Sequence, residues 1–341
     1  MTEVKLQEIC RIEKGKQIDT SQLRTDSLYK YINGGIKESG YYHEYNTDSE
    51  AVLVSEGGAS CGYVNYVNEK FWCGCHCYKL TESKTLAKYL YYALKGNQDK
   101  IMELRSGAAM PNIKKEVFKN MSLLVDFDKD NQQAIVETLD CIQKAINNKT
   151  DELLSLDELV KSRFIEMFMG KGFPILLWNN VFITKTGKLD SNAMVENGEY
   201  PFFTCAKEIF QIDKYAFDQE ALLLAGNNAV GKYDVKYYNG KFNAYQRTYV
   251  LSLLNEGWSY RCFQYQLQDK LDYLQNQSKG TNTKYLTLKI LAELDFVIPP
   301  IELQNEFAEF VKLIDKSKFI VQQQIKDLQE LLDSKMDEYF R

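Results

Sequence analysis

Residues 303–341 have the sequence LQNEFAEFVKLIDKSKFIVQQQIKDLQELLDSKMDEYFR, which contains neither Gly nor Pro. Apolar residues recur in it at alternating spacings of four and three, the pattern of a helix that buries one seam against a partner helix. The seam positions are Phe307, Val311, Ile314, Lys318, Val321, Ile325, Leu328, Leu332, Lys335 and Tyr339, and eight of these ten are apolar. The pattern predicts one long amphipathic helix over 303–341.

A matching seam occurs about 172 residues upstream, within residues 131–170. Its positions are Ile135, Leu139, Ile142, Ile146, Lys149, Leu153, Leu156, Val160, Arg163 and Met167. At 1.5 Å per residue each helix would span roughly 55 Å. Because one chain carries both helices, we predict that they pair as an antiparallel coiled coil; two amphipathic helices lying on separate cores are the alternative. Lys149 and Lys318 within the seams would cost stability but could fix the register.

The rest of the chain also contains an internal sequence repeat. Glu50-Ala-Val-Leu-Val54 is similar to Glu220-Ala-Leu-Leu-Leu224, and residues 12–19 are similar to residues 183–190. The offset between the copies is always 170 to 172 residues. Such a repeat indicates two copies of one structural unit. We therefore predict a mixed α/β fold with two similar domains, 1–130 and 171–302, in a pseudo-two-fold arrangement, separated by a central helix, 131–170, and a C-terminal helix, 303–341.

Within each copy, short segments rich in β-branched and aromatic residues predict strands, and longer polar–apolar segments predict helices. The expected strands are Ala51–Val54, Tyr63–Val67, Ala221–Leu224 and Tyr237–Val250, and the expected helices include Thr85–Met102 and Tyr260–Leu274.

Composition excludes several classes of protein. The chain has 341 residues, of which 45% are hydrophobic and 26% charged, as in globular proteins with a sizeable core. No run approaches the ~20 apolar residues of a membrane span, so no membrane partner is expected. Eight Cys residues at this length favour reduced thiols and a cytoplasmic location. The net charge of −5 argues mildly against a nucleic-acid binder, but 1–130 and 171–302 are each neutral, which leaves room for a basic face on both.

The segment that precedes the C-terminal helix carries a resemblance to a known family. Pro299-Pro-Ile-Glu-Leu-Gln304, set between a strand and the heptads, resembles the conserved region of type I restriction–modification specificity subunits, in which this pattern occurs twice. Residues 107–116, with Pro111-Asn-Ile113, resemble the small-residue segment upstream. The first copy departs from the pattern, because Phe127–Gln132 keeps only the Gln, and the second has Lys284-Tyr-Leu286 in place of Pro111–Ile113.

The resemblance implies a chain with no catalysis of its own. Each of its two domains would read one half of a split, asymmetric sequence in double-stranded DNA, and the helices would set the spacer between the halves. The helical regions would hold two methyltransferase subunits, which bring S-adenosylmethionine and methylate adenine. Up to two restriction subunits, with ATP and Mg²⁺, can join for cleavage. No cofactor is expected on this chain itself.

The chain's own residues offer little support for an enzyme. The chain contains neither Asn-Pro-Pro-Tyr nor Asp-Pro-Pro-Tyr, the methyl-transfer motifs. Gly226–Lys232 is nearly a phosphate-binding P-loop, but Tyr233 stands where a Ser or Thr must supply a hydroxyl to Mg²⁺. A loop whose backbone N–H groups face a DNA phosphate or base edge fits both copies better.

Cys73-Gly-Cys75-His76-Cys77 offers a second tempting cluster. Three thiols and an imidazole could hold zinc, but Cys-x-Cys-x-Cys on one strand would point all three thiols to a single face. We therefore interpret the thiols as small buried apolar groups, with no metal expected, and His76 as facing outward where the second copy has Arg247. Arg and His can both donate hydrogen bonds to base edges, so this pair is a candidate for base reading; a plain solvated position is the alternative.

Polar and glycine residues at strand ends complete the predicted DNA-binding set, although each lysine alone is equally typical of a solvated surface. The candidates are Lys14, Lys16, Tyr31, Asn33, Gly57, Gly58, Ser60 and His76 in the first copy, and Lys185, Lys188, Thr204, Lys207, Asn227, Asn228, Lys232, Lys236, Gln246 and Arg247 in the second. The alternative function is a non-catalytic coiled-coil scaffold whose end domains bind protein or glycan. Its binding would lack the steep salt dependence of phosphate contacts.

Overall fold

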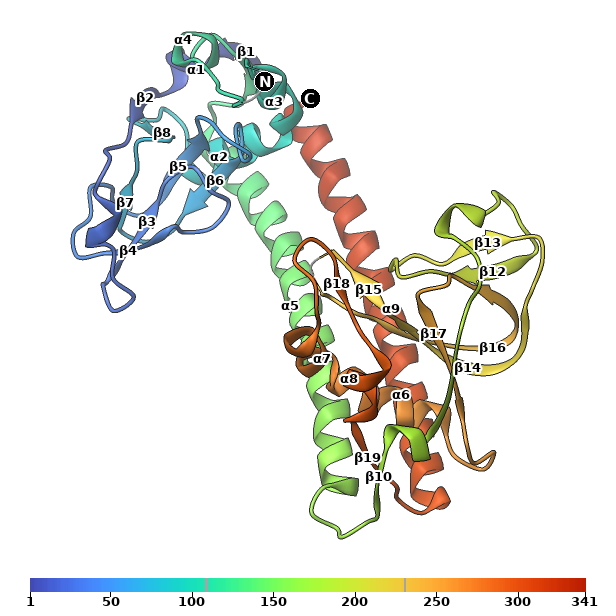
Figure 1. Ribbon diagram of the computed structural model, residues 1–341. Helices are drawn as coiled ribbons and strands as arrows, with labels where there is room; N and C mark the ends of the chain where they lie inside the picture. Colours follow the sequence, from blue (N-terminus) through green and yellow to red (C-terminus); the bar gives the residue numbers. More distant parts are fainter. Residues whose placement is uncertain (108–109, 230) are drawn as a thin grey trace. The chain divides into compact units, whose positions relative to one another are not determined.

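The computed structural model describes residues 1–107, 110–229 and 231–341 of a mixed α/β protein (Figure 1). Ala108, Ala109 and Val230, which belong to the segments 107–116 and 226–232 singled out in the sequence, lie outside the described residues. The chain divides into two compact units, the first formed by 1–152 with 321–341 and the second by 153–320. We call them unit 1 and unit 2.

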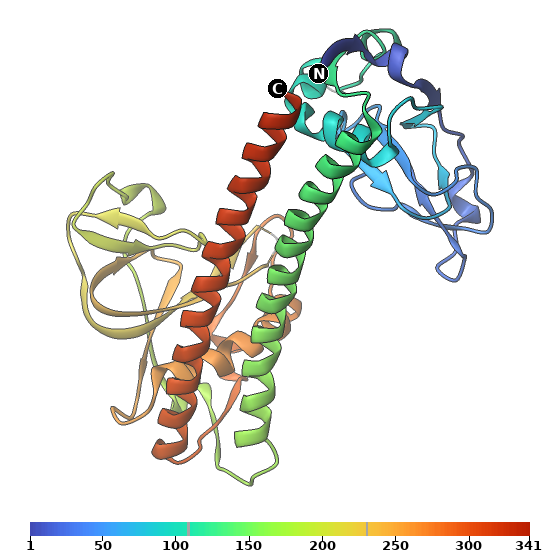
Figure 2. The same ribbon diagram turned by 180° about the vertical axis from the view of Figure 1, so that it is seen from behind.

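Two 40-residue helices, α5 (Lys129–Phe168) and α9 (Ile301–Phe340), each contribute one half to each unit. In unit 1 the first half of α5 packs against the last half of α9, with Ile142 and Ile146 in one core with Leu332. In unit 2 the last half of α5 meets the first half of α9, with Val160 and Phe307 in one core. The pairing within each unit is therefore antiparallel (Figure 2).

The apolar seam positions lie on the inner faces of these helices. Buried or half-buried are Ile135, Leu139, Ile142, Ile146, Leu153, Leu156, Val160, Phe307, Val311, Ile314, Val321, Ile325, Leu328 and Leu332. The charged seam residues find partners at the edge of the seam. Lys149 pairs with Glu152 on its own helix at 2.8 Å, and Lys318 of α9 pairs with Asp157 of α5 at 2.5 Å. An ion pair between the helices limits the cost of a charge in the seam.

The sheet domain of unit 1 is built from short strands. They are β1 (Thr2–Lys5), β2 (Arg11–Lys14), β3 (Tyr29–Ile32), β4 (Gly40–Tyr42), β5 (Ala51–Ser55), β6 (Val64–Val67), β7 (Phe71–Cys73), β8 (Cys77–Thr81) and β9 (Ser122–Val125). The helices are α1 (Leu6–Ile9), α2 (Ala87–Gly96), α3 (Gln98–Glu103) and α4 (Lys115–Phe118). One sheet has the order β2-β8-β5-β6 and another the order β4-β3-β7, with β3 and β7 parallel. The helix α2 packs against β5 and β6, because its buried face carries Tyr89, Leu90 and Leu94.

Unit 2 repeats this arrangement, and some of its strands are longer than those of unit 1. They are β10 (Ile175–Leu177), β11 (Phe182–Thr186), β12 (Tyr200–Phe203), β13 (Phe210–Ile212), β14 (Phe217–Ala225), β15 (Asn227–Asn228), β16 (Val235–Ala244), β17 (Thr248–Leu253), β18 (Lys284–Tyr285) and β19 (Asp295–Val297). The helices are α6 (Tyr260–Asp269), α7 (Leu271–Gln277) and α8 (Leu288–Ala292). The single strand β16 takes the places of both β6 and β7, so the two sheets of unit 1 correspond to one sheet, β11-β17-β14-β16-β12-β13.

Three predicted elements are interrupted in the structure. The helix expected over 85–102 is broken at Asn97, whose side-chain Nδ2 donates to the carbonyls of Ala93 at 2.9 Å and Phe340 at 3.3 Å. The helix expected over 260–274 is broken at Lys270, the residue between α6 and α7. The strand expected over 237–250 is two strands, because a turn intervenes at 245–247. Within the described part of the chain, no helix is long and apolar enough to cross a membrane.

Candidate nucleic-acid interface

In unit 1, the loops after β3 and β5 meet at the turn 74–76 between β7 and β8. The His76 N–H donates to Asn33 Oδ1 at 3.1 Å, and the Glu56 N–H donates to the His76 carbonyl at 2.8 Å. Gly34 lies so close that an added Cβ would come within 2.9 Å of the His76 carbonyl oxygen. The backbone of the turn is therefore fixed by the loops after β3 and β5, while the His76 side chain is exposed to solvent.

The equivalent turn of unit 2, 245–247, is held in the same manner. The Gly226 N–H donates to the Arg247 carbonyl at 2.9 Å, as Glu56 does to His76. The Gln246 N–H donates to the Leu189 carbonyl and the Tyr245 N–H to the Phe203 carbonyl, both at 2.9 Å. Arg247 is exposed, as His76 is. Both units thus present an exposed side chain at equivalent positions, His76 or Arg247, on a turn whose backbone does not depend on that side chain.

A glycine places a lysine beside each turn. Gly15, after β2, lies against the carbonyls of Cys73 and Gly74, and Gly187, after β11, lies against that of Ala244, so closely that neither site has room for a Cβ. The next residue is an exposed lysine in each unit, Lys16 or Lys188. The close approach of the two backbones therefore fixes the backbone position of each lysine next to its turn.

The structure brings together part of the predicted DNA-binding set. Grouped around the turns are Lys16, Asn33, Gly57 and His76 in unit 1, and Lys188, Thr204, Asn227, Gln246 and Arg247 in unit 2. Gly58 and Ser60 follow Gly57 in the loop after β5, and Asn228 pairs with Lys284 in the β15–β18 ribbon. Lys185, Lys207 and Lys232 are exposed. The two groups have the same layout in both units.

Other candidates are occupied by contacts inside their own unit. Lys14 pairs with Glu56 at 2.7 Å, and Glu56, only 11% exposed, also accepts from the Tyr78 hydroxyl at 3.2 Å. Lys236, 14% exposed, donates to Asp234 at 2.6 Å and to the Ala206 carbonyl at 2.9 Å. Tyr31 is buried in a small core with Ile18, and Thr204 is buried as well. The hydroxyl of Tyr31 is therefore not presented to solvent.

Sequence reasoning missed two side-chain pairs that flank the turns. The Cys75 thiol donates to Gln17 Oε1 at 2.8 Å in unit 1. In unit 2 Gln246 Nε2 donates to Asp190 Oδ1 at 2.6 Å. Each pair joins the turn to the loop after the first strand of its sheet, and such a contact between residues 56 or 58 positions apart leaves no local pattern in the sequence.

The cysteines of 73–77 do not share one strand face, and that part of the prediction was wrong. Cys73 ends β7, Cys77 begins β8, and Cys75 lies in the turn between them. At Gly74 the Asn33 side chain comes so close that there is no room for a Cβ. Cys73 and Cys77 are buried, and their mutual hydrogen bond raises the pKa of Cys73 and lowers that of Cys77. Among the described residues, no group of three or more His, Cys, Asp or Glu side chains could hold a metal ion.

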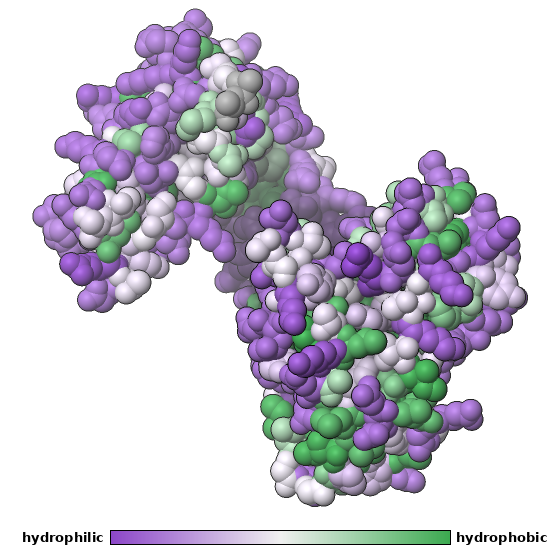
Figure 3. Space-filling model, viewed as in Figure 1, coloured by the Kyte–Doolittle hydropathy of each residue, from purple (hydrophilic) through white to green (hydrophobic). Residues whose placement is uncertain are grey.

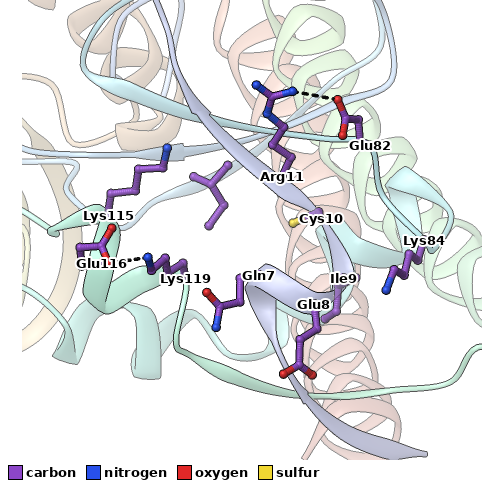
Figure 4. A pocket seen from close by; sticks show the side chains of 11 residues that line it. Gln7, Glu8, Ile9, Cys10, Arg11, Glu82, Lys84, Lys115, Glu116 and Lys119 are labelled. Atoms are coloured by element: carbon purple, nitrogen blue, oxygen red, sulfur yellow. Dashed lines mark hydrogen bonds and ion pairs between the residues drawn. The ribbon is translucent and has the colours of Figure 1, made fainter.

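A cavity of about 610 Å³ in unit 1 is not part of this interface (Figure 4). It borders Arg11, at the opposite end of β2 from Lys16, and its charges largely compensate one another. Arg11 pairs with Glu82 at 3.1 Å, and Lys119 pairs with Glu116. Burial raises the pKa of the Cys10 thiol in its wall to about 12, so this thiol stays protonated at neutral pH.

Comparisons with known proteins fit this arrangement. A family model described as a type I restriction modification DNA specificity domain matches residues 1–156 and 179–330. A putative type I specificity subunit of Mycoplasma genitalium is 24% identical, and the match covers 96% of this chain and 91% of that protein. A putative type I specificity subunit of Mycoplasma pneumoniae is 23% identical, and the match covers 99% of this chain and 96% of that protein. The specificity subunit of the Escherichia coli restriction enzyme EcoDI is 39% identical over 126 residues, 36% of this chain and 27% of that protein.

Solved structures show the same fold. The crystal structure of an S subunit of a type I restriction–modification system from M. genitalium superposes with a TM-score of 0.69 at 21% identity, covering 100% of this chain and 96% of that one. The family match spans both copies of the repeat, and it favours DNA specificity over the scaffold alternative. The family consists of non-catalytic subunits that supply DNA recognition. The chain therefore belongs to the family of type I restriction–modification DNA specificity subunits.

Proposed function

We propose that each sheet domain of this subunit reads one half of a bipartite, asymmetric sequence in double-stranded DNA. The observation that carries the proposal is the repetition of one loop arrangement with a different exposed side chain in each copy. The flanking lysines, Lys16 and Lys188, are shared, whereas His76 of one turn is replaced by Arg247 in the other. The phosphate backbone is the same at both half-sites but the bases differ, so shared cations suit phosphates and differing side chains suit base edges.

The exposed side chains at the turns suit base reading in the major groove. An Arg such as Arg247 can bond the O6 and N7 acceptors of guanine bidentately, and His76 can donate one hydrogen bond to a base acceptor. Since the backbone of each turn is held by hydrogen bonds within the protein, little ordering entropy is lost on binding. We propose that Gln246, oriented by Asp190, contributes to reading in unit 2.

Partner subunits supply the chemistry in this proposal. Large exposed apolar side chains, which suit a protein interface, lie on both long helices, and Figure 3 shows others over the end of unit 2 where β10 lies. They are Leu154, Leu159 and Ile165 on α5, Leu313, Phe319, Ile320 and Leu331 on α9, and Ile175 and Leu177 on β10. We propose that two methyltransferase subunits carrying S-adenosylmethionine bind the helices in the cytoplasm, and that restriction subunits with ATP and Mg²⁺ join for cleavage.

Mapping adenine methylation across the genome tests the proposal. Cells that express the chain with its methyltransferase partner should gain adenine methylation at one split motif, read by single-molecule sequencing. Exchanging residues 171–302 for the same domain of another specificity subunit should change one half of the motif only. A change in both halves, or methylation without a motif, contradicts the proposal.

A further inference from the structure

The two copies share surface features that neither the reading turns nor the cores explain. One such feature is a lysine lying over a tyrosine that itself packs on a second tyrosine. We call these the Lys–Tyr clusters. Cluster 1 consists of Tyr29, Tyr45 and Lys70, and cluster 2 of Tyr200, Tyr215 and Lys241.

In cluster 1 the ammonium of Lys70 lies 4.4 Å from the centroid of the Tyr45 ring and donates to the Tyr45 hydroxyl at 3.0 Å. The Tyr45 ring packs on that of Tyr29, with centroids 5.0 Å apart. Asp48 approaches Lys70 only to 3.8 Å and is 81% exposed, so it screens little of the charge. The hydrogen bond to Tyr45 raises the pKa of Lys70, so the ammonium remains charged.

Cluster 2 repeats the arrangement of the ammonium over two packed rings. The ammonium of Lys241 lies 4.8 Å from the centroid of the Tyr215 ring, and the rings of Tyr215 and Tyr200 have centroids 5.1 Å apart. The equivalent residues also occupy equivalent places in the fold. Tyr29 and Tyr200 begin β3 and β12, Tyr45 and Tyr215 follow β4 and β13 by three residues, and each lysine directly precedes a fully buried Phe.

Neither cluster is required by the core. Tyr45 and Tyr215 are more than two-fifths exposed, and both lysines keep their ammonium at the surface. An aromatic ring under a lysine restricts the long side chain, so less entropy is lost when the charge meets an anion. A surface feature kept in both copies, with no packing role, points to a task that both copies perform.

Resting on the proposed function, we infer that the Lys–Tyr clusters contact the sugar–phosphate backbone of the DNA at each half-site. Lys70 is followed by β7, which leads into the turn at Gly74, and Lys241 is followed by the end of β16, which leads into the turn at Tyr245. Three residues of strand span ~10 Å. That distance is comparable with the ~12 Å width of the major groove, so a turn at the base edges places the cluster near a bordering phosphate.

The clusters differ from the turns in the way that this assignment requires. The turns carry His76 and Arg247, whereas the clusters carry the same three residue types in both units. Lysine meets phosphate as a point charge, and tyrosine hydroxyls can donate to phosphate oxygens, without reading sequence. An acidic partner protein could also bind a lysine, but such a contact would not explain why each cluster lies directly before the strand that leads into the turn.

The salt dependence of DNA binding tests the inference. Lys70→Gln and Lys241→Gln, each in the chain purified with its methyltransferase partner, should lower affinity alike for duplexes with and without the methylated motif. Each loss of one phosphate contact should reduce the slope of log affinity against log salt by ~0.9. Between 50 and 200 mM salt, each variant should therefore lose about 3.5-fold less affinity than the wild type. The methylated motif should stay unchanged.

Matched controls are Lys100→Gln on α3 and Lys289→Gln on α8, exposed lysines on helices away from β3, β4, β12 and β13 within their own units (Figure 1). They should keep the wild-type slope. A wild-type slope in the cluster variants, with or without weaker assembly with the methyltransferase, overturns the inference, and weaker assembly would assign the clusters to a protein contact. A wild-type complex without any sequence preference contradicts the proposed function instead, and the slope on non-specific DNA still tests the clusters.

Discussion

One glutamine at the start of each long helix joins that helix to its sheet domain, and we predict a large cost for losing it. Gln132, fully buried in unit 1, accepts from the Leu86 N–H at 2.8 Å and donates to the Asp126 carbonyl at 2.7 Å. Gln304, fully buried in unit 2, accepts from the Ser259 N–H at 3.0 Å and donates to the Pro299 carbonyl at 2.8 Å. Each amide thus satisfies the N-cap N–H of α2 or α6 and a carbonyl of its own turn.

The expected magnitude follows from the two groups left unpaired. Gln132→Met or Gln304→Met keeps most of the side-chain volume but leaves one N–H and one carbonyl without a hydrogen-bond partner. Each such group lowers the free energy of unfolding by about 1–3 kcal/mol if no water reaches it. Since water can reach part of each site, we expect the free energy of unfolding of the affected unit to fall by about 2–4 kcal/mol. Gln133→Met, at an exposed neighbouring position bonded only to Glu137 of the same helix, should change it by less than about 0.5 kcal/mol.

Urea unfolding followed by tryptophan fluorescence separates the two units. Trp72 lies in unit 1, and Trp178 and Trp258 lie in unit 2. Backgrounds in which the tryptophans of one unit are replaced by Phe therefore report Gln132→Met and Gln304→Met individually. A midpoint shift no larger than that of Gln133→Met would refute the reasoning, because it would mean that the buried amides contribute no more than a surface pair.

Three further predictions concern reading, spacing and pH. His76→Ala and Arg247→Ala should each relax a different half of the methylated motif, and methylome sequencing that finds both variants relaxing the same half would contradict one reader per half-site. Inserting four residues after Lys149, about 6 Å of helix, should change the tolerated spacer by roughly two base pairs, and an unaltered spacer would show that the helices do not set it. Lys270 lowers the pKa of Asp295, so unit 2 should lose stability as pH falls below the ordinary Asp value of about 3.9 toward the lower folded value. Lys270→Met should shrink that loss in acid unfolding, and an identical acid profile would argue against the pair.

The long helices could be predicted from the sequence because their seam is periodic over ten positions and occurs twice. The shared Gln was visible too, since it is the one residue of the turn that survives between Phe127–Gln132 and Pro299–Gln304. Its task was not visible, because its partners Leu86 and Ser259 lie more than forty residues upstream. A periodic pattern indicates which face of a helix is buried, whereas the role of a single buried amide depends on partners that the sequence does not identify.

The breaks in the predicted elements have causes that composition does not reveal. Asn97 ends α2 by bonding the carbonyls of Ala93 and Phe340, and the second of these is 243 residues away. Similarly, the place of Lys14 at a strand end favours a phosphate contact, but in the structure its ammonium pairs with Glu56. Strand-end positions could thus be predicted, but whether each charge is free for a ligand depends on long-range partners.

The division of each long helix between the two units has a consequence for synthesis. Unit 1 needs residues 321–341, which leave the ribosome only after all of unit 2 has been made. Until then Leu139, Ile142 and Ile146 lack the α9 side chains that cover them, so the nascent first domain stays open to chaperones and proteases. A message cut short before residue 321 would therefore yield a first domain whose core lacks Leu332, Met336 and Phe340.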